Sequence, residues 1–330
     1  MNAEREISWG ILSTANIGRR KVVPAIQKAR RCRVVAVASR DLDSARAYAA
    51  ELGIPRALGS YEALLADPEI DAVYIPLPNH LHERWVTAAA AAGKHVLCEK
   101  PLGMNGDEAQ RMADACADAG VVLLEAFMYR LHPSWVAVRN LVAGGRIGRL
   151  SSIQSWFGYS NDDPANIRNI AEYGGGALYD IGCYCINVAR MLFAAEPLDV
   201  KSQIERDSVS GVDTLTSAIL TFDGGTAAFT VSTRTEPDQR VHIYGTHGRI
   251  SIGIPFNIPP DRPTEVYVTA GGDPPVAPST EILTFPTRDQ YTAQAEEFAA
   301  AVLDGAPLQF TAADAVANMR VIDRVFAAAR

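Results

Sequence analysis

The sequence lacks the cysteine pattern of a disulfide-bonded or zinc-binding protein. Its 330 residues include an odd, scattered set of five cysteines, which is not a disulfide framework. Cys183 and Cys185 form an isolated C-x-C, and a structural zinc site needs more ligands than this pair. We therefore expect no metal, and we expect these cysteines to be small buried side chains.

Long hydrophobic runs and basic stretches are also missing. No run reaches the roughly 18 apolar residues that a membrane-spanning helix needs, and residues 1–6 are polar with no signal-peptide core behind them. The formal net charge of −7 and the absence of a basic run argue against nucleic acid or an anionic membrane as a partner. We expect a cytoplasmic protein.

The chain is long enough, and at 48% hydrophobic residues apolar enough, for two domains. In residues 1–126, apolar strands alternate with helices, and this order predicts a doubly wound parallel sheet, the Rossmann fold. The expected strands are 7–12, 34–38, 71–75, 95–98 and 121–125, and the expected helices are 42–52, 61–65, 81–92 and 106–119.

Residues 127–330 have a different pattern, in which β-branched and alternating runs predominate. They predict an α+β domain with a largely antiparallel mixed sheet that binds substrate and forms oligomers. An open face of that sheet favours a homo-oligomer, a dimer or tetramer. The expected strands are 151–157, 200–204, 214–222, 226–232, 241–244, 249–252 and 265–269, with helices at 177–192, 291–303 and 312–329.

The first strand leads into a turn of small residues and then a helix, which is how a dinucleotide-binding unit begins. Ser13 and Ala15 occupy the first two glycine positions of the usual G-x-G-x-x-G, and Gly18 is retained. Small side chains still let a phosphate approach the backbone. The residues assigned to the cofactor here are Ser13, Thr14, Ala15, Asn16 and Ile17.

Ser39 and Arg40 follow the second strand, where an NAD enzyme would carry an acidic residue for the ribose. A hydroxyl and a guanidinium suit a 2′-phosphate instead. The sequence therefore predicts NADP in preference to NAD. The alternative is that Arg40 is solvated and Asp41 binds the ribose.

Two further strand ends should open on the same edge of the sheet. Lys100 follows a buried strand and is the first candidate for catalysis. His80 and His82 form an H-x-H without other metal ligands, so helix capping and packing are the alternative roles for them. The residues assigned to the cofactor at these ends are Pro76, Leu77, Asn79, His82, Glu99 and Lys100.

A helix after Gly174-Gly175-Gly176 carries Asp180 and Tyr184, which are four residues apart and share one face. A carboxylate and a phenol on a mostly apolar helix are candidates for chemistry. The alternative is a core tyrosine whose hydroxyl is satisfied by the aspartate.

Two of these stretches resemble the signatures of one family. Residues 93–101, GKHVLCEKP, are similar to the A-G-K-H-V-x-x-E-K-P motif of the Gfo/Idh/MocA oxidoreductases, and residues 174–184 are similar to its G-G-G-x-x-x-D-x-G-x-H/Y motif. Residues 125–130 and 239–257 resemble further conserved segments, so the likeness covers nearly the whole chain. Tyr at position 184 is similar to the branch with glucose–fructose oxidoreductase, NADP-linked D-xylose dehydrogenase and dimeric dihydrodiol dehydrogenase.

The resemblance implies NADP-dependent hydride transfer from a cyclic sugar, an aldose such as D-xylose or D-glucose that is oxidised at C1 to a lactone. Tyr184 would be the acid/base, and the ammonium of Lys100 would lower its pKa from the usual value of about 10. Asp180 would orient the substrate, and Tyr129 and Arg168 would contact it. The site would lie in a cleft between the domains.

Two other functions stay open. A trans-dihydrodiol dehydrogenase or a keto-sugar reductase would use the same chemistry on another substrate. An NADP(H)-binding regulator without turnover belongs to another class, and the presence of Lys100, Asp180 and Tyr184 argues against it.

Overall fold

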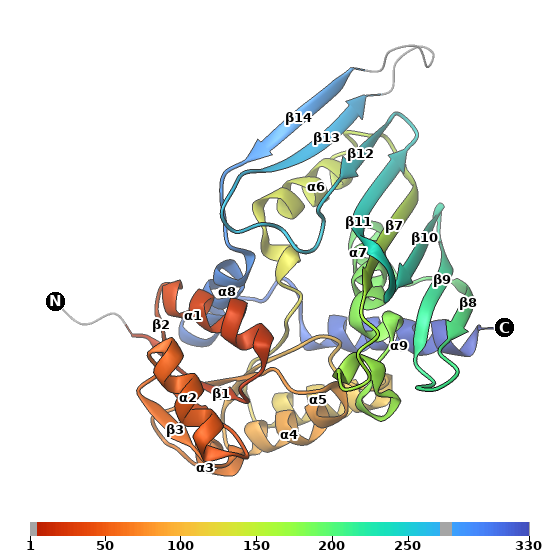
Figure 1. Cartoon of the computed structure of the whole chain (residues 1–330). Coiled ribbons are helices and arrows are strands. Elements are labelled where there is room, and N and C mark those ends of the chain that lie inside the picture. The colour runs from red at the N-terminus through yellow and green to blue at the C-terminus, as the bar shows by residue number, and fades with distance from the viewer. Residues whose placement is uncertain (1–4, 271–278, 330) are drawn as a thin grey trace. The chain divides into compact units, whose positions relative to one another are not determined.

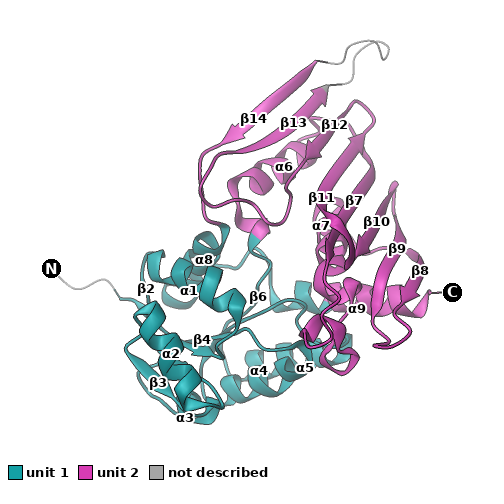
Figure 2. Ribbon diagram, in the orientation of Figure 1, with its two compact units in different colours: residues 1–128, 290–316 teal, residues 129–289, 317–330 magenta. Residues whose placement is uncertain are grey.

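The computed structural model describes residues 5–270 and 279–329, and its chain divides into two compact units. Unit 1 comprises residues 1–128 and 290–316, and unit 2 comprises residues 129–289 and 317–330 (Figure 2). The division at Met128 lies two residues beyond the expected boundary, but the segment 290–316 returns to unit 1. Residues 1–4, part of the stretch considered for a signal peptide, lie outside the described residues.

Unit 1 contains a parallel six-stranded sheet with the strand order β3-β2-β1-β4-β5-β6, of which Figure 1 labels β1, β2 and β3. The order reverses beside β1, as in a doubly wound fold, which confirms the predicted Rossmann domain. The short β3 was not expected. The strands are β1 (Ile7–Leu12), β2 (Cys32–Ala38), β3 (Arg56–Leu58), β4 (Ala72–Ile75), β5 (His95–Cys98) and β6 (Leu123–Glu125).

The apolar first strand explains why residues 290–316 belong to unit 1. Every residue of β1 is buried, and the Trp9 ring packs against Phe298 at a centroid distance of 4.8 Å. Phe298 lies on α8, so this helix completes the core around β1. The helices of unit 1 are α1 (Val23–Lys28), α2 (Leu42–Leu52), α3 (Tyr61–Leu65), α4 (His82–Ala91), α5 (Gly106–Asp118) and α8 (Gln290–Asp304).

Unit 2 is built on an eight-stranded sheet with the order β14-β13-β12-β11-β7-β10-β9-β8. Strands β7 and β10 are parallel and the other neighbours are antiparallel, which confirms the predicted mixed sheet. The edge strand β14 was not expected. The strands are β7 (Leu150–Ser160), β8 (Asp199–Arg206), β9 (Asp213–Phe222), β10 (Gly225–Ser232), β11 (Arg234–Gly245), β12 (Gly248–Ile252), β13 (Thr264–Ala270) and β14 (Thr280–Phe285).

Helices α6 (Pro133–Ala143) and α7 (Cys183–Phe193), with the later part of α9 (Ala312–Ala327), pack on the sheet of unit 2. Ser202 on β8 donates to the Val325 carbonyl of α9 at 2.6 Å. A π-helical turn, Leu178–Gly182, leads directly into α7. No helix in the described ranges has the length and apolarity needed to cross a lipid bilayer.

Candidate functional site

Strands β1, β2, β4 and β5 are parallel, so the turns that follow them lie at one edge of the unit 1 sheet. Ser13 follows β1 with a φ of 124°, a backbone conformation that favours glycine. Its Oγ donates to the Pro76 carbonyl at 3.2 Å and accepts from the Ala15 amide at 3.3 Å. The serine therefore takes over a glycine position and joins the turn after β1 to the turn after β4.

Gly18 is the retained glycine of this turn, and its small size is required. A methyl carbon added there would lie 2.7 Å from the hydroxyl oxygen of the buried Tyr48. That separation is too short for a carbon and an oxygen without a shift of the Tyr48 side chain, which α2 carries. The backbone at Gly18 is therefore held close to α2, as a dinucleotide-binding turn requires.

Asp41, the alternative residue for the ribose, lies between β2 and α2. Its carboxylate caps the N-terminus of α2, where it accepts from the Asp43 amide at 3.1 Å and from the Ser44 hydroxyl at 2.6 Å. These bonds lower the pKa of Asp41. The carboxylate is thus engaged within its own helix, while Arg40 beside it is exposed.

Lys100 lies on a turn whose neighbours are tied down on both sides. Before it, the Glu99 carboxylate accepts from the Tyr74 hydroxyl at 2.5 Å. After it, the Leu102 amide donates to the buried carboxylate of Glu125 at 2.9 Å. The Lys100–Pro101 peptide is cis, and Lys100 itself is half-buried. The turn is thus held by side chains from β4 and β6, Tyr74 on the Glu99 carboxylate and Glu125 on the Leu102 amide.

His82 also belongs to this turn, and its position changes its expected role. It is fully buried, with Nε2 2.8 Å from the Leu77 carbonyl oxygen and Nδ1 3.1 Å from that of Pro101. Burial lowers the pKa of the ring. The enclosed ring packs between the turns that follow β4 and β5. We therefore assign His82 the alternative role, packing, in place of the predicted cofactor contact.

The signature of unit 1 contains two lysines that serve different purposes. Lys94 is buried, and its Nζ donates to the carbonyls of Asp67 and Ile70, each at 2.7 Å. This lysine therefore fastens the loop before β4. Lys100, six residues later, is the one at the strand edge where chemistry is expected.

In unit 2, the glycine signature positions the start of the second candidate helix. A side chain at Gly176, which has a φ of 114°, would overlap the buried carboxylate of Asp213. Asp213 accepts from the Leu178 amide and from the Thr216 hydroxyl, each at 2.7 Å. Burial raises its pKa. This carboxylate therefore fastens the turn that carries Asp180 to β9.

Asp180 lies in a polar cluster with two other side chains. Its Oδ2 accepts from the Tyr159 hydroxyl at 2.6 Å and from Arg168 Nε at 2.9 Å. The predicted neighbours Arg168 and Asp180 are thus brought together. Tyr159 on β7 was not predicted, although it alternates with Phe157 on one face of the strand, a pattern the sequence contains.

Tyr184 lies one helical turn beyond Asp180, among aromatic rings. Its ring centroid is 5.1 Å from Phe256, 5.8 Å from Tyr129 and 5.9 Å from Phe157. The side chain is 6% exposed. The Asp180 carboxylate accepts from a second tyrosine, Tyr159, which the alternative of an Asp180–Tyr184 pair did not include.

Tyr129 was expected to contact substrate, and the structure gives it another task. It is fully buried, and its hydroxyl donates to Asn187 Oδ1 at 2.6 Å. Its ring meets Trp135 of α6 edge-on at 5.2 Å. A ring so enclosed supports Tyr184 from behind, so we assign Tyr129 a positioning role in place of substrate contact.

The described residues contain no group of three or more His, Cys, Asp or Glu side chains placed to hold a metal ion. All five cysteines are buried and free, as expected of small core side chains. The candidate sites are therefore the strand edge of unit 1 and the aromatic and polar clusters of unit 2.

Two family models match the chain in the order of its units. Residues 7–127 match "Oxidoreductase family, NAD-binding Rossmann fold", and residues 135–251 match "GFO/IDH/MocA C-terminal domain". The chain belongs to the GFO/IDH/MocA family. It is therefore an oxidoreductase with an NAD-binding Rossmann domain, as the resemblance of the two signatures implied.

Relatives within the family differ in substrate. The chain is 43% identical to D-xylose 1-dehydrogenase (NADP(+)) 2 of Haloferax volcanii, with 97% of each chain covered. It is 35% identical to mouse trans-1,2-dihydrobenzene-1,2-diol dehydrogenase over 74% of each. The structure of KijD10, a 3-ketoreductase from Actinomadura kijaniata in complex with NADP and TDP-benzene, superposes with a TM-score of 0.92 at 31% identity and covers 99% of this chain and 98% of KijD10.

The sequence analysis missed the residues that support the site: Tyr74, Glu125, Tyr159 and Asp213. Glu125 gave a signal, because it ends an apolar strand as Glu99 does. Tyr74 gave none, since it is a polar residue within a predicted strand, and Asp213 gave none, since it lies just before one. Their partners lie 25 and 35 residues away in the sequence.

Proposed function

We propose that this oxidoreductase uses NADP to transfer hydride between the nicotinamide and a cyclic sugar, with an aldose such as D-xylose or D-glucose oxidised at C1 to a lactone. The observation that carries the proposal is the half-site of unit 2. There, Asp180 and Tyr184 lie on successive turns, one in a polar cluster and the other among aromatic rings. A sugar ring has polar edges and apolar faces, which such a pair of surroundings suits.

The strand edge of unit 1 fits a dinucleotide. Ser13 adopts a backbone conformation usual for glycine, and the close approach of Gly18 to Tyr48 leaves no room for a side chain. Residues 13–17 would hold the pyrophosphate, with the strand ends after β4 and β5 beside the nicotinamide. Bound NADP⁺ supplies the hydride acceptor.

Arg40 supports NADP over NAD. An NAD enzyme needs a carboxylate for the ribose hydroxyls, and the carboxylate of Asp41 is engaged by Asp43 and Ser44. Arg40 is exposed at the end of β2, where a 2′-phosphate would lie. The NADP named for the xylose dehydrogenase and for KijD10 agrees with this preference.

The protein's part in the reaction is proton transfer and orientation. As the C1–H bond of the sugar breaks and its electron pair leaves as hydride, the C1 hydroxyl must lose a proton. We assign the acceptor of that proton to the Tyr184 oxygen. The ammonium of Lys100 would stabilise the tyrosinate and the developing carbonyl oxygen, and Asp180 would accept a hydrogen bond from a neighbouring hydroxyl.

A trans-dihydrodiol is the second candidate substrate. The Phe157 and Phe256 rings are stacked beside Tyr184, with centroids 5.1 Å apart and planes 19° apart, and these apolar surroundings of Tyr184 suit a cyclohexadiene ring. A keto-sugar reductase would run the same proton transfer in the opposite direction.

A substrate panel separates these functions. NADP-loaded enzyme is offered aldoses, inositols and trans-dihydrodiols, and NADPH absorbance is followed. We expect the highest kcat/KM with an aldose. Turnover restricted to the diols would favour the second candidate, and NADPH binding without turnover of any compound in either direction would favour the regulator.

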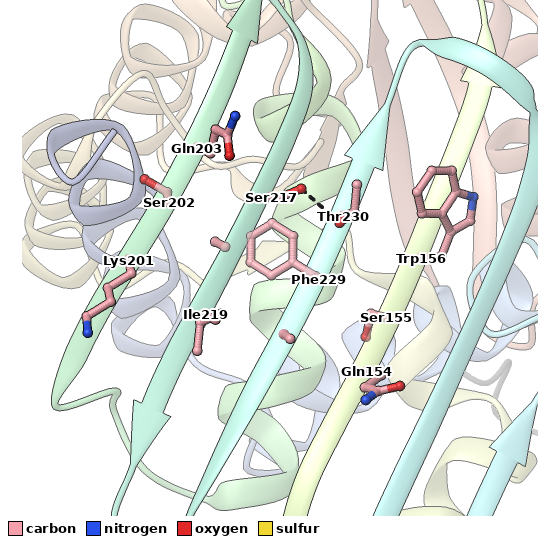
Figure 3. Close-up of a pocket in the computed structure, with 12 residues that line it drawn as sticks. Gln154, Ser155, Trp156, Lys201, Ser202, Gln203, Ser217, Ile219, Phe229 and Thr230 are labelled. Atoms are coloured by element: carbon pink, nitrogen blue, oxygen red, sulfur yellow. Dashed lines mark hydrogen bonds between the residues drawn. The ribbon is translucent and has the colours of Figure 1, made fainter. Parts of the chain in front are cut away.

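We also propose a homo-oligomer formed through the sheet of unit 2. A shallow hollow of about 480 Å³ crosses the four neighbouring strands β7, β10, β9 and β8. Figure 3 shows Ile219 and Trp156 among its lining residues. Ile219 is 48% exposed. Ile219→Glu should therefore give a smaller mass in light scattering, while Ile254→Glu, at an exposed isoleucine outside the strands, should not. A monomeric wild-type mass would reject the oligomer. The cytoplasmic location stays a prediction from the sequence.

A further inference from the structure

The polar cluster around Asp180 contains a residue to which the proposed mechanism gives no task, Tyr159. We propose that Tyr159 is a positioning residue that sets substrate specificity, because it fixes Asp180 and Arg168 as a subsite for two adjacent hydroxyl groups of a cyclic polyol. This inference rests on the proposed function and names the part of the sugar that the site recognises.

Asp180 is held rigidly by its two partners. Tyr159 donates at 2.6 Å and Arg168 Nε at 2.9 Å, and both bonds end on the same oxygen, Oδ2. Hydrogen bonds to an ionised carboxylate are stronger than neutral ones. The side chain of Asp180 is only 17% exposed, so the pair of bonds fixes its orientation with little competition from water.

Tyr159 stays a neutral phenol in this position. Burial and the adjacent carboxylate of Asp180 raise its pKa far above the usual value. Its O–H is therefore a permanent donor to Asp180, and its oxygen keeps lone pairs that can accept a further hydrogen bond. A phenol in this state orients other groups and does not act as the base.

Arg168 supplies the donors of the subsite. Asp180 raises the pKa of Arg168, so the guanidinium stays charged, and its Nε donates to Asp180. Within the described residues, neither terminal nitrogen of Arg168 has a hydrogen-bond partner, and the side chain is 42% exposed. The terminal nitrogens of a guanidinium lie in a fixed fork, which matches two oxygens side by side.

The charge of the cluster favours a neutral ligand. The positive charge of Arg168 is paired with the negative charge of Asp180, so an anionic group would gain attraction from one and repulsion from the other; the charge of Arg234 also acts on Tyr159, but less than either of these. A hydroxyl both donates and accepts, and the cluster offers nitrogen donors beside oxygen acceptors. Two neighbouring hydroxyls of a sugar therefore satisfy it better than a carboxylate or a phosphate.

The same strand offers an apolar surface next to the cluster. Phe157 is two residues before Tyr159 on β7, so the two side chains share a face of the sheet. Phe157 contacts Tyr184 edge-on at 5.9 Å. Strand β7 thus contributes both the Phe157 ring beside Tyr184 and the Tyr159 hydroxyl bonded to Asp180. The subsite therefore lies beside Tyr184, the proposed proton acceptor.

The test uses Tyr159→Phe, which removes one oxygen and keeps the ring. A matched control exists in the same unit, because Tyr267 of β13, which is 37% exposed, donates to Glu265 at 2.6 Å, the same distance. With D-glucose and saturating NADP⁺, we expect Tyr159→Phe to raise KM about tenfold or more with a smaller change in kcat. Tyr267→Phe should leave both constants unchanged.

Monodeoxy analogues of D-glucose make the test independent of folding. In the wild type, loss of a hydroxyl read by the cluster should lower kcat/KM about tenfold to a hundredfold. In Tyr159→Phe and in Arg168→Gln, the kcat/KM of the same analogue should fall much less relative to that of glucose, because these variants no longer bind the hydroxyl that the analogue lacks. A merely structural role for Tyr159 would slow all analogues equally.

Three results would overturn the inference. One is that Tyr159→Phe behaves like Tyr267→Phe. The second is that its penalty is the same for every deoxy analogue. The third is a wild-type preference for D-glucuronate over D-glucose, which would assign the cluster to an anion. In each case the wild type still turns over sugars, so the proposed function stands. Failure of the wild type to bind or oxidise any sugar would overturn both.

Discussion

The Lys100 turn of unit 1 and the Asp180–Tyr184 helix of unit 2 each present a candidate catalytic side chain, by opposite means. The turn is held through its backbone and its flanking residue, with Glu125 on the Leu102 amide and Tyr74 on Glu99. The helix is held by its packing, with Tyr184 6% exposed among aromatic rings.

This difference fits the chemistry expected of each residue. An ammonium on a long flexible side chain needs a fixed backbone at its base and must stay charged. A phenol that exchanges a proton needs a fixed ring, because its oxygen has to meet one substrate atom. A buried carboxylate secures each region, Glu125 in unit 1 and Asp213 in unit 2.

The largest expected effect comes from the two candidate catalytic groups. Lys100→Met and Tyr184→Phe should each lower kcat by about two orders of magnitude or more, the usual contribution of acid–base catalysis. The binding constant of NADP⁺, measured by fluorescence titration of NADPH or competition with it, should change little. Lys94→Met is the control, because it removes two buried hydrogen bonds and should reduce stability without a comparable loss of kcat.

Near-wild-type turnover in either Lys100→Met or Tyr184→Phe would assign the chemistry to another residue. If only one variant were impaired, the two regions would not act on the same proton.

The packing of unit 2 predicts a specific pH dependence of stability. His132 caps α6, and its Nδ1 accepts from the Ser134 amide at 3.2 Å, so the ring must stay neutral there. Burial lowers its pKa from 6.5 to about 4. The unfolded chain therefore binds a proton that the folded chain does not, and stability falls as the pH drops from about 6.5 towards 4.

His132→Asn keeps a capping acceptor and removes the titration. Denaturant unfolding at pH 7 and at pH 4.5 should show that the wild type loses about 2–3 kcal/mol more than the variant over this range. Equal losses would mean that His132 is protonated in the folded protein as it is in the unfolded chain. His132 would then not cap α6 through Nδ1.

Removal of the buried carboxylates compares the two regions directly. Glu125→Leu and Asp213→Leu each leave a buried backbone amide without its acceptor, which costs about 2 kcal/mol of unfolding free energy. Glu125→Gln and Asp213→Asn keep an acceptor oxygen and should lose less. Chemical denaturation measures these differences, and equal stability of the Leu and amide variants would contradict the assigned hydrogen bonds.

The smallest expected effect concerns the cofactor. Arg40→Ala should weaken NADP⁺ binding about tenfold while NAD⁺ binding stays nearly constant, because only the 2′-phosphate is lost as a partner. Arg46→Ala, an exposed arginine of α2 paired with Asp43, serves as the control. Tighter binding of NAD⁺ than of NADP⁺ by the wild type would mean that Arg40 does not recognise a phosphate.

Much of the fold could be predicted, because hydrophobic periodicity marks strands and helices locally. The expected strands 7–12 and 95–98 have the same bounds as β1 and β5. The three-residue β3 and the exposed β14 escaped because neither has a buried apolar pattern. The return of α8 to unit 1 depends on the contact of Trp9 with Phe298, which sequence periodicity does not reveal.

The site was predictable only where a residue is conspicuous in its own segment. Lys100 ends a buried strand, and Asp180 interrupts an apolar helix. The roles of Tyr129 and His82 depended on burial from distant segments, so the sequence suggested contacts that the structure reassigns to support. Tyr159 became significant only through Asp180, 21 residues away.

The pH dependence of sugar oxidation in Lys100→Met tests the pairing of Lys100 with Tyr184 most directly. If the ammonium helps the phenol to release its proton, its removal should shift the rising limb of kcat/KM by about one pH unit or more to the alkaline side. Tyr184→Phe should lack that limb. A limb at the same pH in Lys100→Met as in the wild type would show that the two residues do not share the reacting proton.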